Sequence, residues 1–188
     1  MLSNSERLKV AFVGGHTRRW HAADIIGEER VDSHTWGMLA LVHILHPSPS
    51  VELLGAITFH DSPGEPFSGD IPHGAKVAFP ELKAADVGIS ARVCAALDVD
   101  FEGGLSEEGR WWLSFADMAQ AYLFAKRQVA QGNALMTLVR DECVDYLQAT
   151  VDRPGAPEDA VTLVADVLYC EVDRVMSRNL AQLEAKAR

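Results

Sequence analysis

The sequence lacks any apolar run approaching the roughly 20 residues that a membrane-spanning helix needs. The segment from Met1 to Lys9 also has no apolar centre of the kind found in signal peptides. Cysteines are few and odd in number, and they lie far apart, which argues against a disulfide framework. They are Cys94, Cys143 and Cys170. These absences predict a cytoplasmic protein whose cysteines are buried thiols.

Positive charge is also scarce, since 17 Lys and Arg residues stand against 27 Asp and Glu, a net charge of −10. Phosphate backbones and anionic lipids are bound by positive faces, so we expect neither nucleic acid nor a membrane as a partner. An anionic substrate would have to be met by local positive charge or by a metal ion. The 188 residues, 48% of them hydrophobic, are sufficient for one globular domain with a core.

Alternation of apolar and polar residues, the pattern of a half-buried strand, is nearly absent. Apolar residues recur at helical spacing instead, and Asp32, Ser33 and Ser106 can cap helices. The sequence therefore predicts an all-α fold, a compact helical bundle. We expect helices over about 33–46, 51–61, 81–99, 106–131, 134–150 and 157–185, and a rigid loop rich in Pro and Gly over 62–72.

Four ionisable residues stand in unusual surroundings. His60 and Asp61 end an apolar segment and open the loop, while His34 lies in the first turn of an expected helix. Asp117 is the only charged residue between positions 111 and 125. A buried carboxylate costs several kcal/mol unless it is protonated, ion-paired or bound to a metal. Asp117 is therefore the most informative single residue of the chain.

Together these four side chains offer two nitrogens and two oxygens from three expected helices. Such a mixed set suits a divalent transition metal better than Ca²⁺, which prefers oxygen ligands alone. In the alternative interpretation, His34 is a capping or core histidine and Asp117 a salt-bridge partner. The spacing of the residues leaves both interpretations open.

The order of His34, the His60-Asp61 pair and the distant Asp117 resembles that of the HD-domain metal-dependent phosphohydrolases. Within this family the chain looks most like the HD-type 5′-deoxynucleotidases and the small dATP triphosphohydrolases of some bacteriophages. The similarity covers about residues 18 to 133. Its further matching segments are Arg19-Trp20, Val31 to His34, Glu65 to Pro72, Lys76, 116–117, 121–123 and Gly132-Asn133.

The resemblance implies a role for each matching residue. One divalent transition metal (Co, Mn, Zn, Fe or Ni), with an additional Mg²⁺ as a further option, would be bound by His34, His60, Asp61 and Asp117. The remaining implied roles are acid/base catalysis by Glu65, help from Asp70 at the water or the sugar, a phosphate clamp formed by Arg19 and Lys76, and packing of Trp20 near the base or sugar.

The resemblance also implies a reaction, attack at the α-phosphorus of a purine 2′-deoxynucleotide. We expect a dATP-type triphosphohydrolase that releases deoxynucleoside and triphosphate, with a 5′-deoxynucleotidase acting on monophosphates as the alternative. Hydrolysis of cyclic or alarmone nucleotides is a third branch. From a different class, the chain could be a catalytically inactive helical interaction protein. We expect one HD-type domain over residues 1–188, with a catalytic core at about 16–133 and C-terminal helices over 134–188.

Two positions depart from the family pattern. Gly64 stands where the family has its acid/base Glu, and Glu65 follows one residue later. Ser114 replaces a lysine one helical turn before Asp117, so a triphosphate would need other cations, for which Arg18, Arg110 and Lys126 are candidates. A C-terminal apolar stripe could complete the core or meet another subunit, and since the enzymes that the chain resembles are oligomeric, we expect a homo-oligomer. The stripe consists of Val161, Val164, Leu168, Val172 and Val175.

Overall fold

The structure is a computed structural model, and it describes residues 3–170. Within that range the all-α prediction is confirmed, and the only extended pairing there is an isolated β-bridge between Arg18 and Arg30. The elements are α1 (Asn4–Gly15), α2 (Val31–Leu45), α3 (Val51–Thr58), α4 (Glu65–Ser68), α5 (His73–Ala78), α6 (Pro80–Leu97), α7 (Glu107–Ala130), the 3₁₀ helix η1 (Ala134–Met136), α8 (Thr137–Thr150) and α9 (Ala160–Tyr169).

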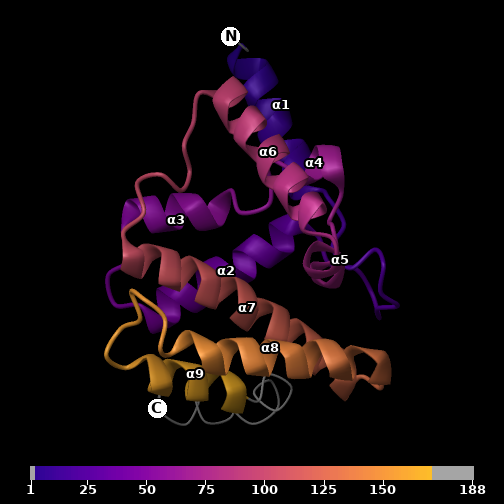
Figure 1. Ribbon diagram of the computed structural model, residues 1–188, viewed down its shortest axis with the longest axis vertical. Helices are drawn as coiled ribbons and strands as arrows, with labels where there is room; N and C mark the ends of the chain where they lie inside the picture. Colours follow the sequence, from indigo (N-terminus) through magenta and orange to yellow (C-terminus); the bar gives the residue numbers. More distant parts are fainter. Residues whose placement is uncertain (1–2, 171–188) are drawn as a thin grey trace, which may run out of the picture.

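Helix α7 is the central element of the fold, lying between α2 and α8 (Figure 1). It begins at a cap predicted from the sequence, since the Ser106 hydroxyl accepts a hydrogen bond from the Gly109 amide at 3.0 Å. Its apolar residues are buried on several sides, because α2, α3 and α8 all pack against it. The fully buried side chains of α7 include Phe115, Ala116, Ala119 and Ala125. Asp117 is thereby placed in the middle of the fold.

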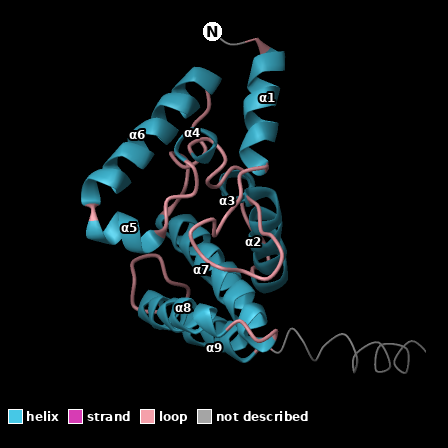
Figure 2. Ribbon diagram, turned by 90° about the vertical axis from the view of Figure 1, so that its right-hand side faces the viewer, coloured by secondary structure: helices cyan, strands magenta, loops and turns pink. Residues whose placement is uncertain are grey.

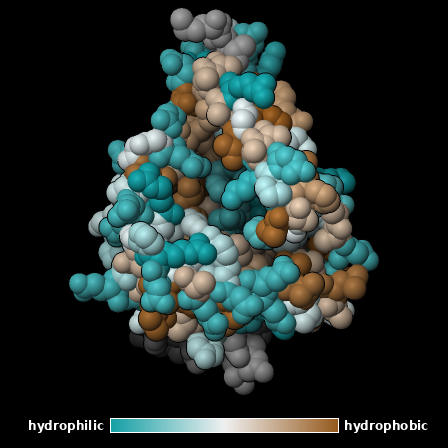
Figure 3. All heavy atoms as spheres, in the orientation of Figure 1, coloured by the Kyte–Doolittle hydropathy of each residue, from teal (hydrophilic) through white to brown (hydrophobic). Residues whose placement is uncertain are grey.

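Helices α1 and α6 extend toward the same end of the molecule (Figure 1), and a quarter-turn view shows them separated from each other (Figure 2). Their surfaces carry exposed apolar residues such as Phe12 and Val87, and brown hydrophobic spheres show among the teal ones at that end (Figure 3). Helix α1 nevertheless makes one very close approach. A Cβ at Gly14 would collide with the Ser62 carbonyl, so only glycine lets α1 approach the loop after α3.

Two details differ from the expectations. The segment over 62–72 was expected to be a loop, but it contains the short helix α4, which Pro66 permits because proline fits the first turn of a helix. The C-terminal stripe is divided, with Val164 buried and Val161 70% exposed. Its members Val172 and Val175 lie outside the described residues. Among residues 3–170, none of the helices combines the length and the apolarity needed to span a bilayer.

Candidate metal centre and adjoining cavity

Three of the four predicted ligands converge from separate elements. His34 comes from the first turn of α2, His60 follows the end of α3, and Asp117 lies in the middle of α7. The Asp117 carboxylate oxygens lie 3.1 Å from His34 Nε2 and 3.7 Å from His60 Nε2. Donors about 2.0–2.2 Å from one first-row metal ion stand roughly 3–4 Å from each other. These three side chains are therefore spaced as ligands of a single ion.

The hydrogen bonds of His34 test whether this centre fits a cation. The His34 ring is fully buried, and its Nδ1 lies 2.5 Å from the side-chain oxygen of Gln120. The Gln120 amide nitrogen donates at 2.7 Å to Glu29, a carboxylate that can only accept, so the Gln120 oxygen must accept from His34 Nδ1–H. The lone pair of Nε2 then faces the Asp117 carboxylate without a hydrogen-bond partner. A cation between the two resolves this conflict, so the residues fit a metal ion.

Asp61, the fourth predicted ligand, lies beside this group. One of its oxygens is 3.6 Å from His60 Nε2, and the other accepts from Arg19 at 2.7 Å. Its backbone is in the left-handed region with φ of 63°, which Asp tolerates better than most residues. The turn thus directs one Asp61 oxygen toward the centre and the other toward a cation, so its role as a ligand remains a prediction.

Electrostatics favour the charged forms of these residues. Burial acts to lower the pKa of His60, but the neighbouring carboxylates, Asp61 first, outweigh burial and raise it to about 9. Burial likewise opposes ionisation of Asp117, yet the neighbouring His34 and His60 rings outweigh burial and hold the pKa of this carboxyl well below the usual range. The Asp117 carboxylate is therefore ionised at neutral pH and available to a cation.

A cavity of about 350 Å³ adjoins the centre. It is lined by parts of the chain that are distant in sequence, including Arg19, Asp61, Asp117 and Tyr146. One part of the lining comes from the segment that runs from the end of α3 into α5, and another part comes from α7 and α8. A volume of this order is at the small end of ligand pockets. The candidate metal centre therefore opens onto a space that can hold a small molecule.

Glu65 lies in this cavity wall at the start of α4 and is only 6% exposed. One of its carboxylate oxygens is buried without a hydrogen-bond partner. Burial, followed by the negative charge of Asp61, raises the pKa of Glu65 to about 8. Glu65 can therefore keep a proton near neutral pH, which suits a general acid.

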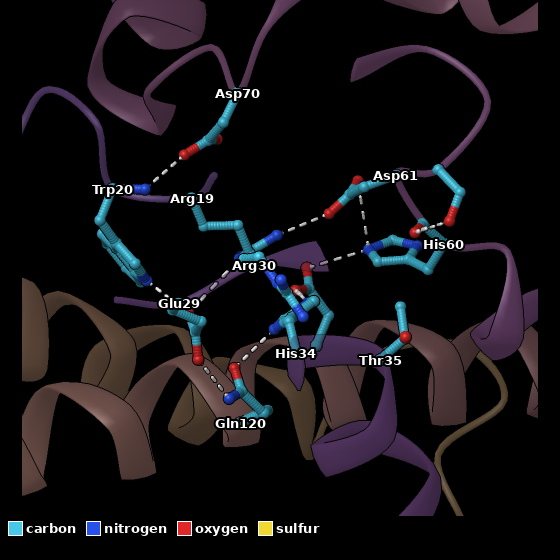
Figure 4. Close-up of polar contacts among 12 residues, drawn as sticks. Arg19, Trp20, Glu29, Arg30, His34, Thr35, His60, Asp61, Asp70 and Gln120 are labelled. Atoms are coloured by element: carbon cyan, nitrogen blue, oxygen red, sulfur yellow. Dashed lines mark hydrogen bonds and ion pairs between the residues drawn. The ribbon is translucent and has the colours of Figure 1, made fainter. Parts of the chain in front are cut away.

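Trp20 forms a second part of the wall, next to Arg19 (Figure 4). Its ring stacks on Phe124 with centroids 5.5 Å apart, and its backbone amide donates to Asp70 at 2.7 Å. The φ of Trp20 is 61°, a strained value for a bulky residue that costs about 1–3 kcal/mol. The predicted helper Asp70 therefore fixes the backbone of the predicted substrate-binding residue Trp20.

Lys76, the second predicted phosphate contact, also lines the cavity from α5. Its ammonium nitrogen pairs with an Asp86 oxygen at 2.7 Å, and the side chain is about one-quarter exposed. Burial opposes the charge, but the hydrogen bond to Asp86 outweighs it and raises the pKa of Lys76. Lys76 therefore carries a full positive charge at the cavity.

The sequence interpretation missed Glu29 and Gln120. Glu29 is 4% exposed although it stands in a charged, surface-like stretch of the sequence, and Gln120 faces it from α7. A signal was present in Gly37, one turn after His34 in α2, since glycine inside a helix is unfavourable by about 1 kcal/mol. A Cβ at Gly37 would lie 2.8 Å from Gln120 Cγ, so the glycine makes room for that side chain.

No protein-family model matches the chain, and no curated protein matches it by sequence. Among solved structures it resembles the cyanophage S-2L HD phosphohydrolase DatZ, whose structure holds dA and one catalytic Zn²⁺. The two chains are 20% identical and superpose with a TM-score of 0.60 over 90% of this chain and 94% of that chain. The predicted resemblance to HD phosphohydrolases is therefore confirmed at the level of the fold.

Proposed function

We propose that this protein is a metal-dependent phosphohydrolase that cleaves purine 2′-deoxynucleotides at the α-phosphorus, with dATP as the first substrate. The observation that carries the proposal is the spacing of the His34, His60 and Asp117 donors at the edge of a cavity. The dA in the DatZ structure supports the nucleoside part of the substrate. The products are the deoxynucleoside and inorganic triphosphate.

A divalent ion held by His34, His60, Asp61 and Asp117 would polarise a phosphoryl oxygen and lower the pKa of water. Arg19 and Lys76, which both line the cavity, would offset the negative charge of the phosphoryl oxygens.

Cleavage of the bond between the phosphorus and the 5′ oxygen leaves an alkoxide, which needs a proton as it departs. Glu65, with a pKa of about 8, holds a proton near neutral pH and can donate it there. The oxygen of the attacking water ends on the phosphate product, so the same residues serve monophosphates and triphosphates alike.

A second candidate is a 5′-deoxynucleotidase acting on dAMP. It is favoured by the small number of cationic side chains that line the cavity. A triphosphate brings about two more negative charges than a monophosphate, yet no additional Lys or Arg among residues 3–170 lines the cavity. Arg18 pairs with Glu28, and Lys126 donates to backbone carbonyls at the C-terminal end of α9, those of Leu168 and Cys170. Ser114, in place of the lysine, is hydrogen-bonded to Tyr146.

The experiment is a side-by-side assay of dATP and dAMP with Zn²⁺, Co²⁺ or Mn²⁺ added. We expect triphosphate from dATP, with slower release of phosphate from dAMP. The reverse order would assign the protein to the second candidate. Without turnover of either nucleotide under any of the three metals, the chain would be the inactive helical interaction protein instead.

A homo-oligomer remains a prediction, and light scattering at micromolar concentration tests it. Within the described residues, Val161 on α9 is an exposed member of the apolar stripe that another subunit could cover. We expect a mass of two or more chains, and a monomeric mass would contradict the prediction.

A further inference from the structure

Glu29 joins two parts of the site that the proposed chemistry treats separately. One of its carboxylate oxygens accepts from the Gln120 amide at 2.7 Å. The other accepts from the Trp20 indole N–H at 2.5 Å and lies 3.5 Å from Arg19 Nε. These contacts are drawn in Figure 4, where the chain of partners runs from Trp20 through Glu29 and Gln120 to His34.

The direction of each hydrogen bond in this chain is determined. A carboxylate accepts only, so both Trp20 and Gln120 must donate to Glu29. The Gln120 oxygen is then left to accept from His34 Nδ1, which leaves the lone pair on Nε2. That nitrogen faces Asp117. One buried carboxylate therefore selects the tautomer of a histidine that it does not touch.

The local backbone supports this arrangement. The Arg19 amide donates to the Glu29 carbonyl at 3.0 Å, next to the bridge between Arg18 and Arg30. The pairing holds Glu29 beside the Arg19-Trp20 segment and directly before α2, which carries His34. Gly37 gives Gln120 the space to reach between them.

We infer that Glu29 is a positioning residue, which acts through Gln120 to present His34 Nε2 to the metal ion while its second oxygen holds the Trp20 wall of the cavity. This inference rests on the metal site of the proposed function. Partners that orient a ligating histidine typically change metal affinity about 10- to 100-fold when they are removed. Glu29 and Gln120 together form such a partner.

Glu29→Gln tests the inference because it alters hydrogen-bond direction with little change in shape. The new amide at position 29 has one acceptor for two donors, so Gln120 must turn its NH₂ group toward His34. The proton of His34 then moves to Nε2, where it blocks ligation. We expect about 10- to 100-fold weaker Zn²⁺ or Co²⁺ binding by calorimetry. Glu28→Gln, the same change at the exposed neighbour, should leave the affinity within about twofold of the wild type.

The exchanged pair is the sharper variant. Gln120→Glu alone places two carboxylates face to face and should also weaken metal binding. In Glu29→Gln combined with Gln120→Glu, the amide at position 29 donates to the carboxylate at position 120, which again accepts from His34 Nδ1–H. The net charge is unchanged, and Trp20 keeps an acceptor. We expect metal affinity to return to within about threefold of the wild type, since His34 Nδ1–H and the Trp20 indole N–H each regain an acceptor and only the bond between positions 29 and 120 is reversed.

Equal metal affinity in the wild type and Glu29→Gln would overturn the inference. A double variant that binds the metal ion no more tightly than the weaker-binding single variant would overturn it as well. If the variants do not fold, long-range ¹H–¹⁵N spectra of the Zn²⁺-loaded wild type decide, with the His34 signals assigned from a His34→Gln variant. We expect a proton on Nδ1, and a proton on Nε2 would overturn the inference. A wild-type protein that binds neither Zn²⁺ nor Co²⁺ would overturn the proposed function and this inference with it.

Discussion

The two halves of the candidate site differ in what holds their side chains. The helix-held half consists of His34 on α2 and of Asp117 and Gln120 on α7, two helices that pack against each other. The loop-held half runs from the end of α3 through α5, a segment of loops interrupted by the short helices α4 and α5, and contains Asp61, Glu65, Asp70 and Lys76. Each half contributes to the same cavity, but their local environments are unlike.

In the helix-held half the polar groups are ordered in a chain, and the one buried nitrogen without a hydrogen-bond partner faces Asp117. The loop-held half keeps an unpartnered oxygen on Glu65, and Asp61 has a left-handed backbone. Strain and unsatisfied groups persist where the surrounding structure enforces them, often at functional sites. We infer that the first half is organised to hold a cation and the second to act on the substrate.

Asp117→Ala is expected to have the largest effect, because it removes the carboxylate that faces both histidines. Metal binding and turnover of dATP or dAMP should both fall below detection. Calorimetry with Zn²⁺ and an assay of released phosphates measure the two losses. Asp141→Ala, at an exposed carboxylate on α8, is the control and should leave both unchanged. Full metal affinity in Asp117→Ala would contradict the inference that the helix-held half is the one organised to hold a cation.

Glu65→Gln should separate the halves most clearly. The loop-held half would lose its acid/base residue while the centre keeps its ligands, so kcat should fall by about 10²- to 10⁴-fold with metal affinity retained. Steady-state kinetics and metal titration on the same sample measure this. A normal kcat would move the role to Asp70, the next carboxylate on the cavity wall.

Lys76→Met should have a smaller effect, on substrate binding more than on chemistry. A charge-assisted contact to phosphate contributes about 1.5–3 kcal/mol, so KM should rise roughly tenfold to a hundredfold. The matched control is Lys83→Met, at an exposed lysine on α6 that does not line the cavity. An unchanged KM would indicate that Lys76 serves only as the ion-pair partner of Asp86.

The last prediction concerns stability in the absence of metal and substrate. The pKa of Glu65 is raised to about 8 in the folded protein, so between about pH 5 and 8 the folded state binds more protons at this residue than the unfolded state. The stabilising contribution is therefore present below the unfolded pKa and is lost as pH rises through 8. The wild type should lose stability relative to Glu65→Gln over this window, on the order of a few kcal/mol.

Urea unfolding at several pH values, with a chelator present, measures that difference. If the free energies of unfolding of the wild type and of Glu65→Gln changed in parallel with pH, Glu65 would have an ordinary pKa. The burial of Glu65 and the charge of Asp61 would then leave its ionisation unperturbed.

Much of the fold could be predicted from local patterns. Apolar spacing and the Ser106 cap predicted α7, and the charge isolated in that helix singled out Asp117. The regularities involved are short-range, because helix periodicity and capping depend on residues a few positions apart. The same patterns missed α4, since its Pro and Gly content is typical of loops as well as of first turns.

The sequence by itself determined the all-α class and most of the longer helices, because helix periodicity and capping depend on residue type and spacing, and it singled out the candidate ligands. Only the tertiary structure decided that Glu29 is buried, that Gln120 lies between it and His34, and that Arg18, Arg110 and Lys126 are not in the cavity wall. The partners in these contacts come from helices and loops far apart in the chain. Whether a charged residue is solvated or buried depends on what packs against it, and no local pattern contains that information.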